Sequence, residues 1–414
     1  MRLALALCTT CACGRIGFDG AIDGATYHEP GGELDPSFGT GGSTTLGTGQ
    51  ARLELYDVIP RDPGGYLCIG PHELSSGAHF GLFGFGSDGQ LDPAFGTGGI
   101  ADVGPTSLDY GYGLLRLPDG RIVVTGDGDD KTGTNDNITI GMIDPAGAVD
   151  PAFGVGGFQR FDGGELVGDT AKRSVRLASS VVTCGAWSYN TPDSHFALVA
   201  LGLDGAPVAA FGAGGRVTAD FHPGVGDTCA DLTVGPSGNL VAVGSTNARG
   251  FVVAYRADGT RDPSFAGGST VELGTAFAAL SGITIAPDGD IVTVGESANM
   301  GLVARLASDG TPRAGFGQAS TVMLPGVAVL TDVVVQPNGK IIAVGESATL
   351  AGVVVRLLAD GTLDPTFATG GVLQLRAGSE TVFERVILAA DGAIIAVGYV
   401  GSVPLTRGVI ARLR

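Results

Sequence analysis

One short motif recurs seven times along this chain of 414 residues, and its spacing limits what the chain can fold into. Its clearest copies read LDPSFGTGG from Leu34, LDPAFGTGG from Leu91 and LDPTFATGG from Leu363. The phenylalanines of the motif and of its degenerate copies stand at positions 38, 95, 153, 211, 265, 316 and 367. Their intervals of 51 to 58 residues match no helical or coiled-coil period.

Each interval also contains a turn followed by an apolar run, such as PDGRIVVTG from Pro118 and PNGKIIAVG from Pro337. Proline sets φ for the first corner of a turn, and glycine accepts the left-handed corner, so each copy predicts a β-hairpin. The Val- and Ile-rich runs are typical of strands that are covered on both faces. A further strand, such as VVVRL from Val353, leads through an Asp-Gly turn back to the motif, which another β-run follows.

Four strands per repeat, Gly-rich turns and no amphipathic helix predict an all-β fold, a seven-bladed β-propeller of four-stranded antiparallel blades. The chain starts its first repeat at the motif and fourth strand, Leu34 to Leu46, and stops at Arg414 after a third strand. We therefore expect the N-terminal strand to complete the last blade and close the ring. The alternative is a β-solenoid, although its rungs are typically shorter than these repeats.

The combination of LDPxFGxGG and PDGxIxVxG at this spacing resembles the delta-sixty repeat β-propeller family of bacterial secreted and surface proteins. The resemblance covers Leu34 to Arg414. It implies the fold and carries no activity over to particular residues. Three copies depart from the pattern, at residues 176–180 and around Phe211 and Phe316, and we expect those blades to be less regular.

Composition agrees with a β protein and narrows the partners. The 72 glycines would weaken long helices throughout the chain. Twenty-four basic against 42 acidic residues give a net charge of −18, which repels nucleic acid and anionic membrane surfaces. We expect a monomer that does not bind nucleic acid.

The N-terminus predicts export. Arg2, the apolar stretch Leu3 to Leu7 and the small residues before Cys13 resemble a relaxed lipobox with Cys13 as the lipidation site. The predicted organisation is a signal segment at 1–13, a flexible tether at 14–33 and the propeller at 34–414. The membrane is then contacted only through the lipid anchor, and the protein is a bacterial cell-envelope lipoprotein or a secreted protein. An ordinary signal peptide and a misassigned start are the alternatives.

Three further cysteines, Cys68, Cys184 and Cys229, lie in or near predicted strands. Cys68 and Cys184 occupy positions where other repeats have small apolar residues, which favours buried free thiols. A disulfide between Cys184 and Cys229 in neighbouring blades is the alternative for an exported protein. Metal binding by such scattered cysteines is not expected.

The ligand-binding face is predicted from loop length. Hairpins within blades alternate between the two faces of the ring. The short turns specified by the Pro-Asp-Gly and Asp-Gly sequences, called the coded turns, share one face. The loops joining second and third strands share the other, and the longest are 71–79, 127–137 and 186–195 in the first three blades. They place Trp187 and Tyr189 near His195, and the aromatic pair could stack on a sugar or peptide. The alternative for Trp187 is a structural plug.

The same loops carry candidate metal ligands. Asp127, Asp129, Asp130 and Asp136 offer hard oxygen ligands to calcium, although their spacing fits no EF-hand loop. His72 and His79 with His195 could contribute to a ligand or metal site, whereas solvated surface histidines are the commoner case. We expect no cofactor, with calcium as the alternative.

Three interpretations of the function follow. The favoured one is a non-catalytic propeller that binds a protein or glycan through its variable-loop face. The alternative is a secreted hydrolase or lyase with its site at the mouth of the central channel on that face, for which titratable groups with perturbed pKa values would gather in the channel. A purely architectural module is a third reading.

Overall fold

The computed structural model describes residues 29–414 except for 48–50, 75–76, 105–108, 130–135, 164–167, 189–193, 247–248, 275–277 and 404. Cys13 and the predicted signal segment lie outside the described residues. The described part contains 28 strands and one short 3-10 helix, Ala266–Gly268. None of its helices has the length and apolar character needed to cross a membrane.

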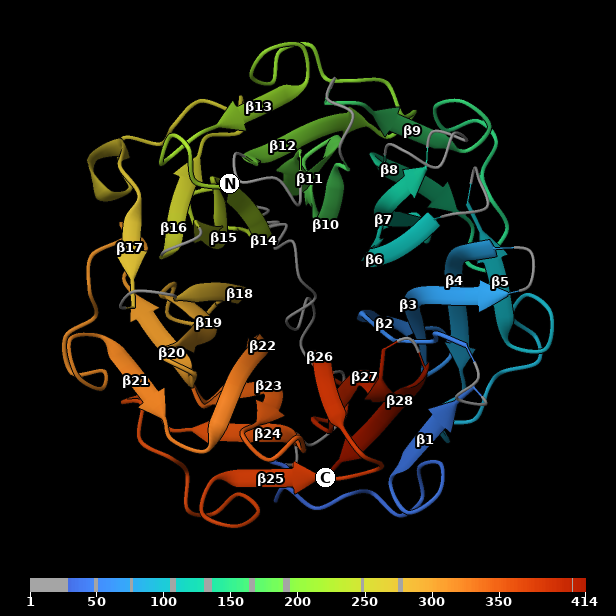
Figure 1. Ribbon diagram of the computed structural model, residues 1–414, viewed down its shortest axis with the longest axis vertical. Helices are drawn as coiled ribbons and strands as arrows, with labels where there is room; N and C mark the ends of the chain where they lie inside the picture. The colour runs from blue at the N-terminus through green and yellow to red at the C-terminus, as the bar shows by residue number, and fades with distance from the viewer. Residues whose placement is uncertain are drawn as a thin grey trace, which may run out of the picture.

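The strands form seven four-stranded sheets arranged as blades around a centre (Figure 1). Blades one to three comprise β2(Asp57–Arg61), β3(Gly65–Leu74), β4(Gly77–Phe85) and β5(Ile100–Val103); β6(Asp109–Arg116), β7(Ile122–Asp129), β8(Asp136–Ile143) and β9(Phe158–Phe161); and β10(Thr170–Leu177), β11(Ser180–Trp187), β12(His195–Gly202) and β13(Arg216–Ala219). Blades four and five comprise β14(Asp227–Val234), β15(Leu240–Thr246), β16(Gly250–Tyr255) and β17(Val271–Leu273); and β18(Ala279–Ile285), β19(Ile291–Ser297), β20(Met300–Leu306) and β21(Thr321–Leu324). Blade six comprises β22(Val327–Val335), β23(Ile341–Ser347), β24(Gly352–Leu357) and β25(Val372–Leu375), and blade seven β26(Thr381–Leu388), β27(Ile394–Ser402), β28(Leu405–Leu413) and β1(Ser43–Leu46).

The predicted seven-bladed propeller is confirmed, and so is its closure. In blade seven the sheet order is β1-β28-β27-β26, so the N-terminal strand forms the outer edge of the C-terminal blade. β1 runs antiparallel to β28, with Ser43 opposite Ala411 and Leu46 opposite Gly408. Pairing these chain ends leaves no incomplete blade in the ring.

The marker phenylalanines are the contacts between neighbouring blades. All seven are at most 2% exposed. Phe38, which precedes β1 of blade seven, lies against the Asp88-Gly89 turn between β4 and β5 of blade one, where a Cβ on Gly89 would come within 2.6 Å of the Phe38 ring. Gly89 has φ +77°, so glycine is required there for both space and backbone conformation. The Asp-Gly turn and the phenylalanine therefore recur together because each motif packs under the turn that follows it along the ring.

A backbone hydrogen bond accompanies each of these contacts. The residue after the marker donates its N–H to the carbonyl of the residue preceding the turn glycine, as Gly39 does to Asp88 at 2.7 Å and Gly317 to Asp360 at 2.9 Å. At the seventh position Ala368 donates to Gly31 at 2.8 Å. Gly32, with φ +88°, takes the place of the turn glycine beside the Phe367 ring. The chain ends thus rebuild the turn that the break in the ring removes.

This contact corrects the predicted tether, which was expected to be flexible over 14–33. Residues 29–33 instead pack on the propeller. Arg356, 2% exposed in its side chain, donates from Nη1 to the carbonyl of Pro30 and lies 3.2 Å from the Glu29 carboxylate. Arg414 accepts hydrogen bonds from the N–H groups of Gly32 and Glu33. The segment is held because the incomplete seventh turn leaves backbone groups that only it can satisfy.

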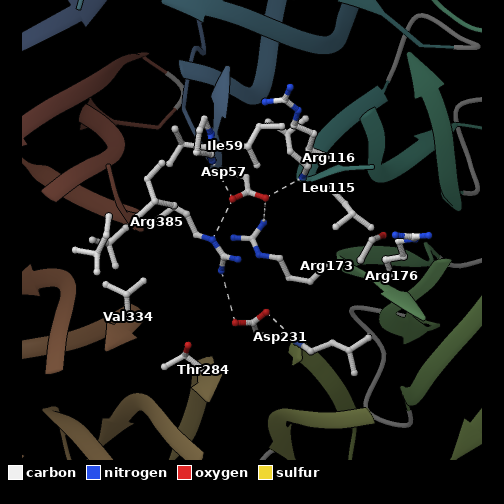
Figure 2. Close-up of a pocket in the computed structure, with 18 of the residues that line it drawn as sticks. Asp57, Ile59, Leu115, Arg116, Arg173, Arg176, Asp231, Thr284, Val334 and Arg385 are labelled. Atoms are coloured by element: carbon white, nitrogen blue, oxygen red, sulfur yellow. Dashed lines mark hydrogen bonds and ion pairs between the residues drawn. The ribbon is translucent and has the colours of Figure 1, made fainter. Parts of the chain in front are cut away.

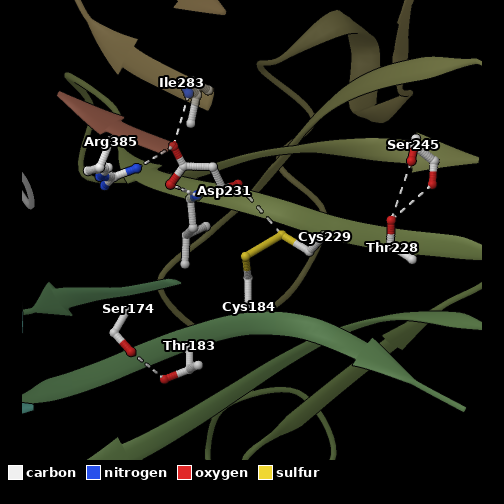
Figure 3. Close-up of a disulfide and its surroundings, with 10 residues drawn as sticks. Ser174, Thr183, Cys184, Thr228, Cys229, Asp231, Ser245, Ile283 and Arg385 are labelled. Carbon is white, nitrogen blue, oxygen red and sulfur yellow. Dashed lines mark hydrogen bonds and ion pairs between the residues drawn. A yellow bond between two sulfur atoms is a disulfide. The ribbon is translucent and has the colours of Figure 1, made fainter. Parts of the chain in front are cut away.

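A disulfide joins Cys184 on β11 to Cys229 on β14, with their Cα atoms 5.7 Å apart (Figure 3). Of the two alternatives left open by the sequence, the structure shows the bond between blades three and four, whereas Cys68 is a buried free thiol. Both bonded cysteines are at most 1% exposed and lie in one apolar cluster with Phe196 and Phe251. The bond therefore crosses an interface that is already closely packed.

Reducing this bond should destabilise the protein. Replacing both cysteines with alanine opens a loop of 45 residues, and we expect the free energy of unfolding to fall by about 2–4 kcal/mol. Urea unfolding of oxidised, reduced and Cys184→Ala/Cys229→Ala protein measures it, with Cys68→Ala as the control that keeps the disulfide. Coincident unfolding curves for the oxidised and double-variant proteins would contradict the expectation.

Candidate functional site

The inner strands of all seven blades line the centre of the ring, and one position on each strand faces its neighbours there. In blades two to seven this position follows a β-bulge, as between Gly111 and Gly113 or between Phe383 and Arg385. The seven residues at this level are Asp57, Gly113, Arg173, Asp231, Gly282, Asp332 and Arg385. Charged residues thus meet at the centre of an otherwise apolar fold.

Arg385 joins three blades through aspartates. Its Nε lies 3.0 Å from Asp57 Oδ1, and its Nη1 lies 3.2 Å from Asp332 Oδ1 and 3.6 Å from Asp231 Oδ2. Figure 2 shows the guanidinium between Asp57 and Asp231. Burial disfavours the charged form, but the three carboxylates together raise the pKa of Arg385. The side chain is 9% exposed, so water screens these interactions weakly.

The aspartates also bind the backbone of the next blade. Asp57 accepts the N–H of Leu114 at 2.8 Å, Asp231 that of Ile283 at 3.0 Å and Asp332 that of Val386 at 2.9 Å. Arg173 lies 3.3 Å from Asp57 Oδ2 and donates to the Tyr56 carbonyl at 3.1 Å. This group of five residues, Asp57, Arg173, Asp231, Asp332 and Arg385, is called the central charged layer. It fastens the inner strands of the ring to one another.

A cavity of about 480 Å³ lies against this layer and is called the funnel. Its wall comes from the C-terminal halves of the inner strands, including Ile59, Leu115, Val334 and Ile387. These halves lead into the short coded turns, so the funnel belongs to the face opposite the variable loops. Arg116 and Arg176 lie at its edge on blades two and three (Figure 2). Its volume is that of a small-molecule or side-chain site.

A second, polar hollow of about 200 Å³ lies on the variable-loop face. Its lining residues are Arg52, Tyr110, Tyr112, Asp127, Asp136, Gly168 and Asp169. This set is called the tyrosine hollow. The Arg52 guanidinium lies 5.4 Å from the centre of the Tyr110 ring, and Lys172 Nζ lies 3.8 Å from the centre of the Tyr112 ring. Aromatic faces, a cation and carboxylates therefore surround one small space.

Burial perturbs the acids of this region. It raises the pKa of Asp127 to about 7, against the opposing effect of Lys172, and raises the pKa of Asp169 to about 6, against hydrogen bonds from Ser188 and Gly163. Asp127 Oδ1 is buried without a hydrogen-bond partner among the described residues. Burial, then repulsion by Glu54, raises the pKa of Glu384 to about 7. Burial also lowers the pKa of Lys172.

The structure separates the predicted aromatic contacts. Trp187 is 5% exposed, packs in the core of blades two and three, and donates from its indole N–H to Thr218 Oγ1 at 3.0 Å. Its ring is therefore a structural plug, the alternative raised from sequence, and it offers no open face to a ligand. Tyr189 lies outside the described residues. His195 is half-buried and sits opposite Trp187 in the β11–β12 ladder.

The first predicted loop, 71–79, is mostly strand. β3 and β4 pair from His72 opposite His79 to Leu74 opposite Gly77, because the ladder continues to satisfy backbone groups beyond the body of the blade. His72 Nδ1 lies 2.7 Å from Asp102 Oδ1. The two histidines are thus neighbours in blade one, whereas His195 belongs to blade three, so the structure does not gather the three.

The predicted calcium ligands are only partly described. Asp127 and Asp136 both line the tyrosine hollow, the side chain of Asp129 is not described, and Asp130 lies outside the described residues. No group of three or more His, Cys, Asp or Glu residues within the described ranges is arranged to hold a metal ion. Asp127 and Asp136 instead share their hollow with a cationic and an aromatic group.

Sequence reasoning missed the central charged layer and the tyrosines. A usable signal exists, since counting five residues back from the hairpin-turn residues Pro236 and Pro337 arrives at Asp231 and Asp332. The same count from Pro118 and Pro287 arrives at glycine. Aligning the repeats on their turns therefore exposes a position at which the repeats differ in charge.

The comparisons with known proteins support the fold. A family model described as a domain of unknown function (DUF5122) beta-propeller matches residues 336–367, a span that runs from one coded turn to the marker Phe367. No curated protein matches the chain. The virginiamycin B lyase of Staphylococcus aureus is similar in structure, with TM-score 0.52 and 11% identity over 89% of this chain and 98% of that one. The WD40 propeller domain of Doa1 has TM-score 0.50 and 12% identity over 89% and 96%.

Removing Arg385 should weaken the ring at its centre. Arg385→Met leaves buried carboxylates without their shared cation, and we expect the free energy of unfolding to fall by about 3–5 kcal/mol at pH 7. Urea unfolding measures the loss. Arg249→Met, which breaks an ion pair at an exposed arginine, is the control and should change stability by less than about 1 kcal/mol.

Equal losses for the two variants would contradict this role of Arg385.

The raised pKa of Asp127 predicts a pH dependence of known sign. The folded state favours the protonated carboxyl, so the contribution of Asp127 to stability is full below its ordinary pKa of 3.8 and is lost as the pH rises through about 7. Asp127→Asn should therefore match the wild type near pH 4 and be more stable than it at about pH 8. Thermal unfolding across this range tests the expectation.

Asp258→Asn is the matched control for Asp127→Asn. A hydrogen bond from the Thr260 hydroxyl lowers the pKa of the exposed Asp258, so this variant should lose stability relative to the wild type above its ordinary pKa. A difference between Asp127→Asn and the wild type that does not change with pH would count against the raised pKa.

Proposed function

We propose that the protein is an exported or surface-anchored binding module that recognises a glycan in the tyrosine hollow of its variable-loop face. The observation that carries the proposal is the combination in one hollow of Tyr110, the Arg52 guanidinium and Asp127 Oδ1, which has no hydrogen-bond partner within the described ranges. Sugars present apolar C–H faces and hydroxyl groups. Aromatic rings suit the first, and carboxylates and arginine suit the second.

Burial strengthens the case for a hydroxyl ligand. An acceptor that is buried without a partner costs free energy, and a sugar hydroxyl could donate to Asp127 Oδ1 and remove that cost. Arg52 is already oriented, since it donates from Nε to Glu54 at 3.0 Å and from Nη2 to the Tyr56 hydroxyl at 2.7 Å. A guanidinium held this way loses little freedom when a ligand binds.

Catalysis on the same face is the second candidate, and one observation favours it. Asp127 and Glu384 both have pKa values raised to about 7, which suits groups that exchange protons near neutral pH. In a hydrolysis, one carboxyl would protonate the leaving oxygen while the other removed a proton from the attacking water. Titratable groups of this kind in the channel are what the hydrolase or lyase alternative requires.

A glycan-binding screen with the full chain tests the proposal. We expect Tyr110→Ala to weaken binding at least about tenfold, equivalent to roughly 1.4 kcal/mol, because the ring face is lost. Trp187→Phe is the control, and it should leave affinity unchanged because Trp187 lies in the core. Absence of any bound sugar, or equal loss in both variants, would refute the assignment to the hollow.

The same oligosaccharides, incubated with the protein and analysed by mass spectrometry, separate binding from catalysis. Unchanged masses with retained affinity support the binding module. Cleavage that Glu384→Gln abolishes would establish the hydrolase or lyase instead.

A further inference from the structure

The funnel is an apolar site on a chain of net charge −18, yet the charges around it are basic. Its wall is formed by aliphatic side chains, and Arg173 and Arg385 at its floor are balanced by the aspartates that contact them. Arg116 and Arg176 at its edge add positive charge, and among the described residues Arg116 forms an ion pair with the exposed Asp62, whereas Arg176 forms none. Arg176 Nε is buried without a hydrogen-bond partner among the described residues. A partner for the funnel should therefore combine apolar and acidic side chains.

The described chain begins on the funnel face of blade six. Glu29 forms ion pairs with Lys340 and Arg356, and Lys340 belongs to the turn between β22 and β23. β22 reaches that turn directly after Val334 and Val335, which line the funnel. Glu29 is thus held at the funnel face of blade six by these ion pairs.

The 15 residues before that point have the required composition. Residues 14–28 read GRIGFDGAIDGATYH and include the large apolar residues Ile16, Phe18 and Ile22 and the two acids Asp19 and Asp23. An extended chain spans at most about 3.3–3.6 Å per residue, so this segment reaches up to about 50 Å from Glu29. That is ample to lie across the centre of the ring. The attachment keeps the segment at a high local concentration, so a weak contact suffices.

We propose that residues 14–28 dock in the funnel of their own chain, with Ile16, Phe18 and Ile22 against its aliphatic wall and Asp19 and Asp23 facing Arg116 and Arg176. The segment then covers the face opposite the tyrosine hollow. In a lipidated protein it would turn that covered face toward the membrane and leave the variable-loop face outward. The docking itself requires neither lipidation nor the proposed glycan binding.

Tryptic cleavage of the native full chain tests the docking, because Arg15 supplies the one tryptic bond within residues 14–28, Arg15–Ile16. Cleavage at a docked segment follows the fraction of molecules in which it is open. We expect Leu115→Asp in the funnel wall to speed cleavage at Arg15–Ile16 at least about tenfold, as measured by intact mass. Val155→Asp, at an apolar side chain that is 85% exposed, is the control and should leave the rate unchanged.

Two further variants keep the test decisive where Leu115→Asp impairs folding, which thermal unfolding reports. Phe18→Asp changes only the segment and Arg176→Glu changes only the edge of the funnel, and each should also speed cleavage. Equal rates in the wild type, Phe18→Asp and Arg176→Glu would overturn the docking. Protection that depends on protein concentration would also overturn it, by showing that the funnel holds the segment of a second copy.

Discussion

Every blade of this molecule depends on the closure of the ring. Seven sheets packed face to face around a centre leave two unmatched ends, and an open end would expose a row of unpaired backbone groups. β1 closes the ring by pairing with β28. Residues 29–33 add a second closing contact, because they replace the missing Asp-Gly turn and accept a hydrogen bond from the N–H of Ala368. Closure therefore rests on both a strand and a turn, and it connects the first described residues to the last.

Closure also sets the chemistry of the centre. Seven inner strands converge on one axis, where the side chains of Asp57, Arg173 and Arg385 are at most 13% exposed. The chain places charged groups at this level, and it can do so because Arg385 and Arg173 meet aspartates that also bind backbone N–H groups of the next blade. A buried charge is tolerated only when it is paired and hydrogen-bonded. The central charged layer thus separates the apolar funnel from the polar groups of the variable-loop face.

Much of the fold could be predicted from sequence, because the repeat encodes local turns and strands at a fixed period. The contact between Phe38 and Gly89 is an example, because the marker phenylalanine or the residue after it packs against a turn glycine in each copy of the motif. The site could not be predicted in the same way. Trp187 was predicted as a ligand contact because it lies beside Tyr189 in a long polar segment, but β11 continues to Trp187 and its ring turns into the core. The predicted loop boundaries were wrong for the same reason, because composition does not show where two strands continue to pair beyond the body of a blade.

The residues whose side chains could bind a ligand or take part in a reaction lie where the repeats differ from one another. A motif that recurs seven times serves what all blades share, namely turns, blade contacts and strand ladders, and a single ligand site needs features that are not repeated. The residues at the bulges of the inner strands supply them: Tyr112, Lys172, Ala230, Ser281, Thr331 and Glu384, with Tyr56 at the matching place in blade one. They share one backbone position and almost no side-chain chemistry. In a propeller built from near-identical blades, asymmetry at such a position is therefore a better guide to the binding face than the length or polarity of the loops.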